Sequence, residues 1–128
     1  MEITKQVLND TYTKAFNESL RAHSNTGYTV IDGNGKAYDD TGAGKFYLCG
    51  FCYLHYYCNT PEGRATHKFM KKIGMEPGKH WKSGFEVTID AAGWHTNGMF
   101  EIMCDGYQAV ADLLRENGHN VYLNSMLD

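Results

Sequence analysis

The residues best suited to chemistry lie in one short run. Residues 46–58 hold three of the four cysteines of this 128-residue chain, together with one histidine and six aromatic side chains. Cys49, Cys52, His55 and Cys58 recur at every third position. Thiolates and imidazoles are ligands that zinc prefers, and a thiol beside an imidazole can also act as a nucleophile. The run therefore offers a structural zinc site or a small thiol- or histidine-based enzyme as two alternatives.

The same run also has the composition of a central β-strand. Both alternating faces of residues 46–58 are apolar or amphipathic, which is typical of a strand covered on both sides. On an extended strand, residues three apart point to opposite faces, so Cys49 and Cys52 could not both reach one ion. A zinc site would also need ligands from His55, Cys58, His67 or Cys104, and no second closely spaced pair follows downstream. We therefore predict a strand and no cofactor, and keep zinc as the alternative.

Turn and cap residues divide the rest of the chain into alternating helices and strands. Apolar residues at helical spacing predict a first helix over 4–23. A hairpin at 28–38 and a loop at 39–44 are expected next. After the aromatic strand, Thr60 and Pro61 favour a helix start, and Gly74 a helix end. The remaining elements are a strand at 85–89, a helix at 98–117 and a strand at 120–124, although Met99–Met103 could instead be a strand.

This order predicts an α+β fold built as a two-layer sandwich. About three helices would pack on one face of a four- or five-stranded mixed sheet. The length fits a single domain over 1–128, with the N-terminal helix and hairpin in 1–45 and the strand-helix-strand-helix-strand core in 46–128. No apolar run approaches the length that spans a bilayer, and no secretion signal is evident, so a cytoplasmic location without a membrane partner is expected.

Charge is distributed unevenly along a chain of net charge -3. Residues 64–82 hold six basic residues against Glu76, whereas residues 83–128 hold seven acidic residues against Arg115. Helical spacing places several of the basic residues on one helix surface, opposite Ala65, Phe69 and Ile73. The others follow in a loop beside a tryptophan. The candidate binding residues are Arg64, Lys68, Lys71, Lys72, Lys79, Trp81 and Lys82.

Such a surface suits an acidic protein partner or the phosphates and bases of a nucleic acid. A merely solvated helix face is the alternative interpretation of the same charges. Nine tyrosines and two tryptophans also suit a protein-binding face or a homodimer contact.

Four short motifs in residues 46–128 resemble a group of small uncharacterised bacteriophage proteins. They are Cys49-Gly50-Phe51, Phe69-Met-Lys-Lys72, Ser83-Gly84-Phe85 and the ending Gly118-x-x-Val-Tyr122-x-x-Ser125-Met-Leu-Asp128. The chain departs from the pattern at Met126, where arginine is usual, and at Cys52, where a small residue is usual. The second departure argues against a role for Cys52 throughout the group. The resemblance transfers no activity, and implies a small accessory phage protein that works inside an infected bacterium.

Together these observations predict a non-enzymatic binding module. It would contact, and inhibit, a host macromolecule such as a defence or transcription component, with a host protein as the first expected partner and nucleic acid as the second. The binding part rests on the segregated charge, the aromatic content and the lack of a catalytic set, and the phage setting rests on the resemblance.

Overall fold

The computed structural model describes residues 2–26, 50–80, 84–89 and 100–127. Several sequence-based predictions lie outside these residues: the hairpin at 28–38, the loop at 39–44, the start of the aromatic run up to Cys49, and Met99. Within the described segments, no helix combines the length and the apolar content that crossing a bilayer requires.

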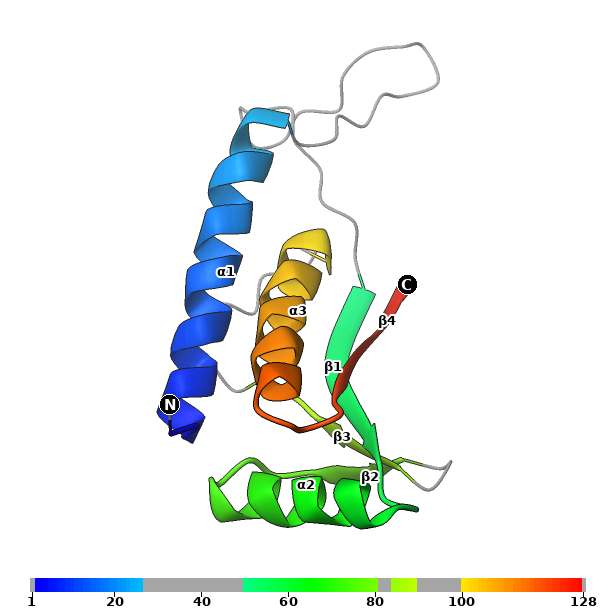
Figure 1. The fold of residues 1–128 in the computed structure, drawn as a ribbon. Helices are drawn as coiled ribbons and strands as arrows, with labels where there is room; N and C mark the ends of the chain where they lie inside the picture. The colour runs from blue at the N-terminus through cyan, green and yellow to red at the C-terminus, as the bar shows by residue number, and fades with distance from the viewer. Residues whose placement is uncertain (1, 27–49, 81–83, 90–99, 128) are drawn as a thin grey trace.

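Three helices pack against a four-stranded sheet, which confirms the predicted α+β sandwich (Figure 1). In chain order the elements are α1 (Lys5–Thr26), β1 (Gly50–Tyr57), α2 (Pro61–Lys72), β2 (Gly78–His80), β3 (Gly84–Val87), α3 (Phe100–Glu116) and β4 (Tyr122–Leu127). The strands lie in the order β2-β3-β1-β4. From β1 onward this is the split βαβ arrangement, with α1 added before it.

The expectation of a mixed sheet was wrong, because every strand pair is antiparallel. Each helical crossover skips one strand position in the sheet. As a result β3 lies between β1 and β2, and β1 lies between β3 and β4. The strands that run in the same direction are therefore never adjacent.

One strand was not predicted and two others differ from their predicted bounds, with β3 covering Gly84–Val87 rather than 85–89. Residues 78–80, expected in a loop, form the edge strand β2, which pairs with β3. The last strand covers 122–127 rather than 120–124 and pairs with β1 from His55↔Tyr122 to Gly50↔Leu127. Its start is delayed because the end of α3 uses the preceding residues: the His119 amide bonds the Leu114 carbonyl at 2.9 Å. This bond, with a positive φ at Gly118, closes the helix in a Schellman motif.

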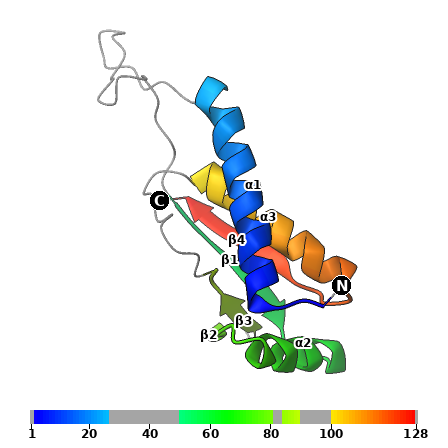
Figure 2. The same cartoon turned by 90° about the vertical axis from the view of Figure 1, so that its left-hand side faces the viewer.

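The core lies between the sheet and the helices (Figures 1 and 2). One face of β1 supplies the buried residues Cys52, Leu54 and Tyr56. Helix α3 covers this face, and α1 packs on α3. The apolar residues whose helical spacing predicts the first helix face the core: Ile3, just before α1, and Leu8, Tyr12 and Phe16 are buried. Val7, Ala15 and Leu20 of the same stripe are half-buried.

A glycine sets how closely α1 approaches α3. A Cβ added to Gly106 would lie 2.8 Å from Cε2 of Tyr12, so the ring occupies the space that a side chain would need. The Tyr12 ring also meets the ring of Tyr107 edge-on, at 5.1 Å between centroids. Helix propensity alone makes Gly106 a weak point of α3, whereas in the structure it is the point of contact with α1.

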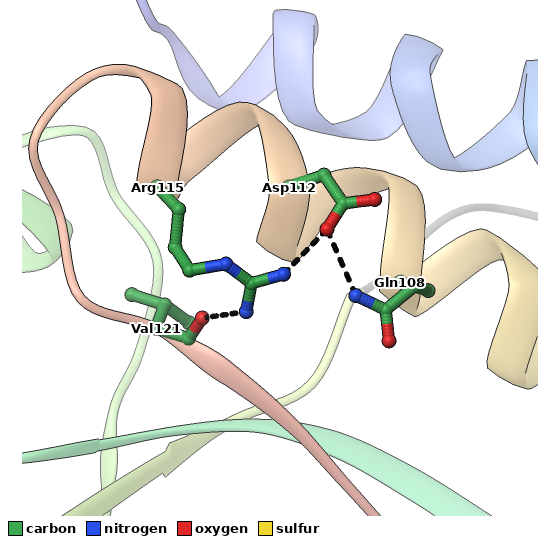
Figure 3. A network of polar contacts seen from close by, with 4 residues as sticks. All are labelled: Gln108, Asp112, Arg115 and Val121. Atoms are coloured by element: carbon green, nitrogen blue, oxygen red, sulfur yellow. Dashed lines mark hydrogen bonds and ion pairs between the residues drawn. The ribbon is translucent and has the colours of Figure 1, made fainter.

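A polar network fixes the end of α3 to the start of the last strand (Figure 3). The Arg115 guanidinium donates to the Val121 carbonyl at 2.8 Å and forms an ion pair with Asp112. Gln108 donates to the same Asp112 carboxylate at 2.9 Å. The network holds the turn that directs β4 back along β1.

Candidate functional site

Helix α2 is capped at both ends, as its sequence predicts. The Thr60 hydroxyl accepts from the Gly63 amide at 3.0 Å, and Pro61 stands at the first helical position. At the other end Gly74 has a φ of +85°, and the Met75 amide reaches the Met70 carbonyl at 3.0 Å. Glu62 in the first turn and Lys71 and Lys72 in the last complement the helix dipole. Local interactions therefore fix both ends of the helix.

One side of α2 is packed, and it includes two of the three residues that the sequence predicts, Phe69 and Ile73. Thr66 and Met70 are buried, Phe69 and Ile73 are half-buried, and Ala65 is exposed. The predicted stripe of Ala65, Phe69 and Ile73 is therefore wrong at Ala65 and shifted by one position. The shift follows from the partners of the helix, because Thr66 bonds His119 and Phe69 stacks on the same ring.

Two histidines form polar and stacking contacts between α2 and the rest of the protein. Nδ1 of His67 lies 2.9 Å from the Tyr56 hydroxyl of β1, and the His67 ring stacks on Phe85 of β3 at 3.8 Å. Nδ1 of His119 lies 3.1 Å from the Thr66 hydroxyl, and its ring stacks on Phe69 at 4.2 Å. Burial lowers the pKa of both histidines, and the Lys71 cation lowers that of His67 further.

The other side of α2 is basic and exposed. Arg64, Lys68, Lys71 and Lys72 are all solvent-exposed, and Glu62 is the only acidic residue of the helix. Within the described part of the chain, none of these four cations forms an ion pair. We call this set the basic face of α2. Four uncompensated cations on a rigid helix create a local positive potential that attracts anionic surfaces.

Two further cations border the basic face. Lys79 on β2 is exposed and is paired in register with Phe85, whose ring stacks on His67 of α2. Lys5 on α1 was missed by sequence reasoning: its Cδ lies 3.9 Å from where a Cβ would stand on Gly74, at the end of α2. No local sequence pattern indicates this role for Lys5, because Lys5 precedes Gly74 by more than 50 positions in the chain. Trp81 and Lys82 lie outside the described residues.

The cysteine and histidine run does not converge on one point. Cys52 is buried on the helix-covered face of β1, whereas His55 lies on the opposite face. Cys58 follows the strand, with its Sγ 3.9 Å from the Gly63 carbonyl, and Cys49 lies outside the described residues. Among the residues that the structure describes, no three metal-ligating side chains gather in one place.

A different cysteine pair is brought together instead. Sγ of Cys52 lies 2.9 Å from Sγ of Cys104 on α3, although the residues are 52 positions apart. Sequence reasoning named Cys104 only as a fourth zinc ligand. The pairing needs the tertiary packing of α3 on β1, so no spacing rule could have found it.

The open face of the sheet carries apolar side chains. Tyr57, Tyr122 and Met126 are the exposed large hydrophobic residues of the described chain, with 47%, 43% and 61% of their surface accessible. The register places all three on the face of the sheet that points away from the helices. Tyr122 lies under the Arg115 guanidinium, at 5.8 Å from its ring centroid, and the Tyr57 carbonyl lies against Gly63 in the first turn of α2.

Comparison with known proteins adds no relative. No model of a protein family, no curated protein and no solved structure matches this chain. The geometry of the candidate site is therefore the basis for its interpretation.

Proposed function

We propose that this protein is a non-enzymatic binding module that holds an acidic surface of a partner protein against the basic face of α2. The observation that carries the proposal is the group of four exposed cations, Arg64, Lys68, Lys71 and Lys72, on a helix that is capped at both ends and packed along its other side. A preformed helix loses little backbone entropy on binding, so less of the contact energy is offset by the cost of ordering the backbone.

The composition of the basic face favours a protein over single-stranded nucleic acid. Proteins that bind single strands combine cations with stacking aromatic rings in one groove. Helix α2 itself presents no exposed ring of Phe, Tyr or Trp beside its cations, because Phe69 is half-buried and stacks on His119. The resemblance to phage proteins supplies the proposed setting: a host protein of an infected bacterium, such as a defence or transcription component, which the module would inhibit.

The basic face is tested by reversing charge in two matched ways. The test variant carries Lys68→Glu and Lys72→Glu, which lie on one helical surface. The control carries Thr13→Glu, Lys14→Glu and Asn17→Glu, all exposed on α1, and changes the net charge by the same amount. Binding of a 20-residue glutamate peptide and of a 20-base-pair DNA duplex is measured for each at low and moderate salt.

We expect the peptide to bind wild type and control with equal affinity, and this affinity should fall as salt rises. The test variant should bind the peptide at least about tenfold more weakly. In host lysate, the proteins retained by wild type and control should be lost from the test variant. Equal retention by all three proteins would contradict the assignment. Tighter binding of the duplex than of the peptide would replace the protein partner by nucleic acid.

A further inference from the structure

Two thiols approach each other closely away from the basic face, on the helix-covered side of the sheet. Cys52 on β1 is 7% exposed, and Cys104 on α3 is half-buried. Their Sγ atoms are 2.9 Å apart, which is shorter than the roughly 3.5–4.0 Å at which non-bonded heavy atoms pack. A disulfide needs about 2.05 Å between the sulfurs. A movement of under about 1 Å would therefore bring the two sulfurs to bonding distance.

We propose that Cys52 and Cys104 form an intramolecular disulfide, a redox modification that joins the central strand β1 to helix α3. The pair lies where α3 crosses the helix-covered face of the sheet, and its members come from two elements that pack on each other over their length. A cross-link there closes a long loop through α2, β2 and β3, and constrains the unfolded chain more than the folded one.

The surroundings determine how readily the bond forms. Burial raises the pKa of the Cys52 thiol, and its hydrogen bond with Cys104 raises it further. Burial also raises the pKa of Cys104, against hydrogen bonds from Cys52 and Ser125 that lower it, while the nearby charges of Asp105 and Glu101 raise it again. Both thiols are thus protonated at neutral pH, and since the thiolate is the nucleophile, the bond should form slowly at pH 7 and faster in alkali.

The oxidant would be a small-molecule disulfide such as oxidised glutathione. The half-buried Cys104 loses its proton and attacks one glutathione sulfur, which forms a mixed disulfide and releases one glutathione thiolate. Cys52 then loses its proton and attacks Sγ of Cys104, which expels the second glutathione. Overall, two protein thiols lose two electrons and two protons, and one glutathione disulfide becomes two glutathione thiols.

The other cysteines provide controls. Cys58 lies beyond the end of β1, with its sulfur against the Gly63 carbonyl. A variant with Cys49→Ser and Cys58→Ser keeps the proposed pair alone, and Cys104→Ser removes it through a conservative change at a half-buried position. Circular dichroism establishes that each variant is folded.

The experiment equilibrates the folded, reduced proteins with excess oxidised glutathione at about pH 8, then alkylates the remaining thiols and maps the peptides by mass spectrometry. We expect wild type and the double-serine variant to lose about 2 Da and to yield a linked Cys52–Cys104 peptide pair. Their melting temperature should rise by on the order of 10 °C and fall back on reduction. The Cys104→Ser variant should show neither effect.

Three outcomes would overturn the proposal. One is a folded wild-type protein whose Cys52 and Cys104 remain fully alkylated at equilibrium. Another is a stable glutathione adduct on Cys104 without the internal link. The last is a linkage that uses Cys49 or Cys58 in place of either partner. The same reaction in denaturant should scatter the links among all four cysteines, which shows that the fold directs the pairing.

Discussion

The Tyr56 hydroxyl lies 2.9 Å from Nδ1 of His67, and this contact joins the central strand of the sheet to the helix that carries the basic face. Phe85 of β3 stacks on both rings, at 5.9 Å from Tyr56 and 3.8 Å from His67. The contact between α2 and the sheet is therefore aromatic and contains a titratable group. Protonation of that group should loosen the helix that presents the cations.

Stability should consequently fall in mild acid. The pKa of His67 and that of His119 are both lowered in the folded protein, chiefly by burial. The unfolded chain, whose histidines titrate near 6.5, then binds more protons than the folded protein. The stabilisation from the neutral rings is complete above about pH 6.5 and is lost as pH falls through the lower folded pKa values.

The measurement is the urea midpoint at about pH 7.5 and pH 5.5, for wild type and for a variant with His67→Gln and His119→Gln. Carboxylates titrate in both proteins, so the difference between the two pH responses isolates the histidines. Between the higher and the lower pH, the urea midpoint of wild type should fall more than that of the variant. Equal losses would exclude the two histidines as the cause.

The bond between Thr66 and His119 should be worth a measurable part of the stability. Replacing Thr66 by valine keeps the shape of the side chain but leaves Nδ1 of His119 without its 3.1 Å partner. We expect a loss of about 1–2 kcal/mol in the free energy of unfolding. Thr13→Val on the exposed side of α1 is the matched control, since it makes the same change in helix propensity without a partner from another element. A loss no larger than that of the control would show that the bond contributes nothing.

Local signals explain which parts of the fold were predictable. Thr60, Pro61 and Gly74 mark the ends of α2 because capping needs only neighbouring residues. Strand direction was not predictable in this way, since it depends on where each crossover returns to the sheet, and the expected mixed sheet proved to be antiparallel. The edge strand β2 was missed because Gly78-Lys79-His80 is too short and too polar to show an alternating pattern.

The candidate site likewise has features that local sequence predicts and features that depend on tertiary packing. Arg64, Lys68, Lys71 and Lys72 share an exposed face because they are neighbours on one helix. Lys5, His119 and Cys104 each meet a partner more than 50 positions away, so their roles depend on tertiary packing. Ala65 was misplaced for the same reason, because the packed stripe of α2 follows its contact with His119 rather than hydropathy alone.

The approach of α1 to α3 predicts that a methyl group at Gly106 is destabilising. Alanine improves helix propensity by about 1 kcal/mol, but its Cβ would stand 2.8 Å from Cε2 of Tyr12 in a closely packed core. Overpacking of this kind costs about 1–3 kcal/mol. We expect Gly106→Ala to lower the free energy of unfolding by roughly 1–2 kcal/mol.

A double-mutant cycle with Tyr12→Leu separates the clash from other effects. If the ring is the obstacle, Gly106→Ala should cost less in the Tyr12→Leu background than in wild type, with a coupling of about 0.5–3 kcal/mol. Additive effects of the two substitutions would mean that the cost of the methyl group does not come from the Tyr12 ring. Chemical denaturation of the four proteins provides all the values.

The Arg115 network should stabilise β4 locally. Replacing Arg115 by methionine keeps much of the aliphatic stem but removes the 2.8 Å bond to the Val121 carbonyl and the ion pair with Asp112. Since the guanidinium is partly exposed, we expect a global cost of only about 1 kcal/mol.

The larger effect should be local, because the bond holds the turn between α3 and β4. Amide exchange of residues 122–127 should therefore accelerate more than that of β1 or β3, whereas Glu116→Gln, at an exposed position of the same helix turn, should leave the pattern unchanged. Uniform acceleration across the sheet would show that Arg115 acts on the whole fold and not on this turn.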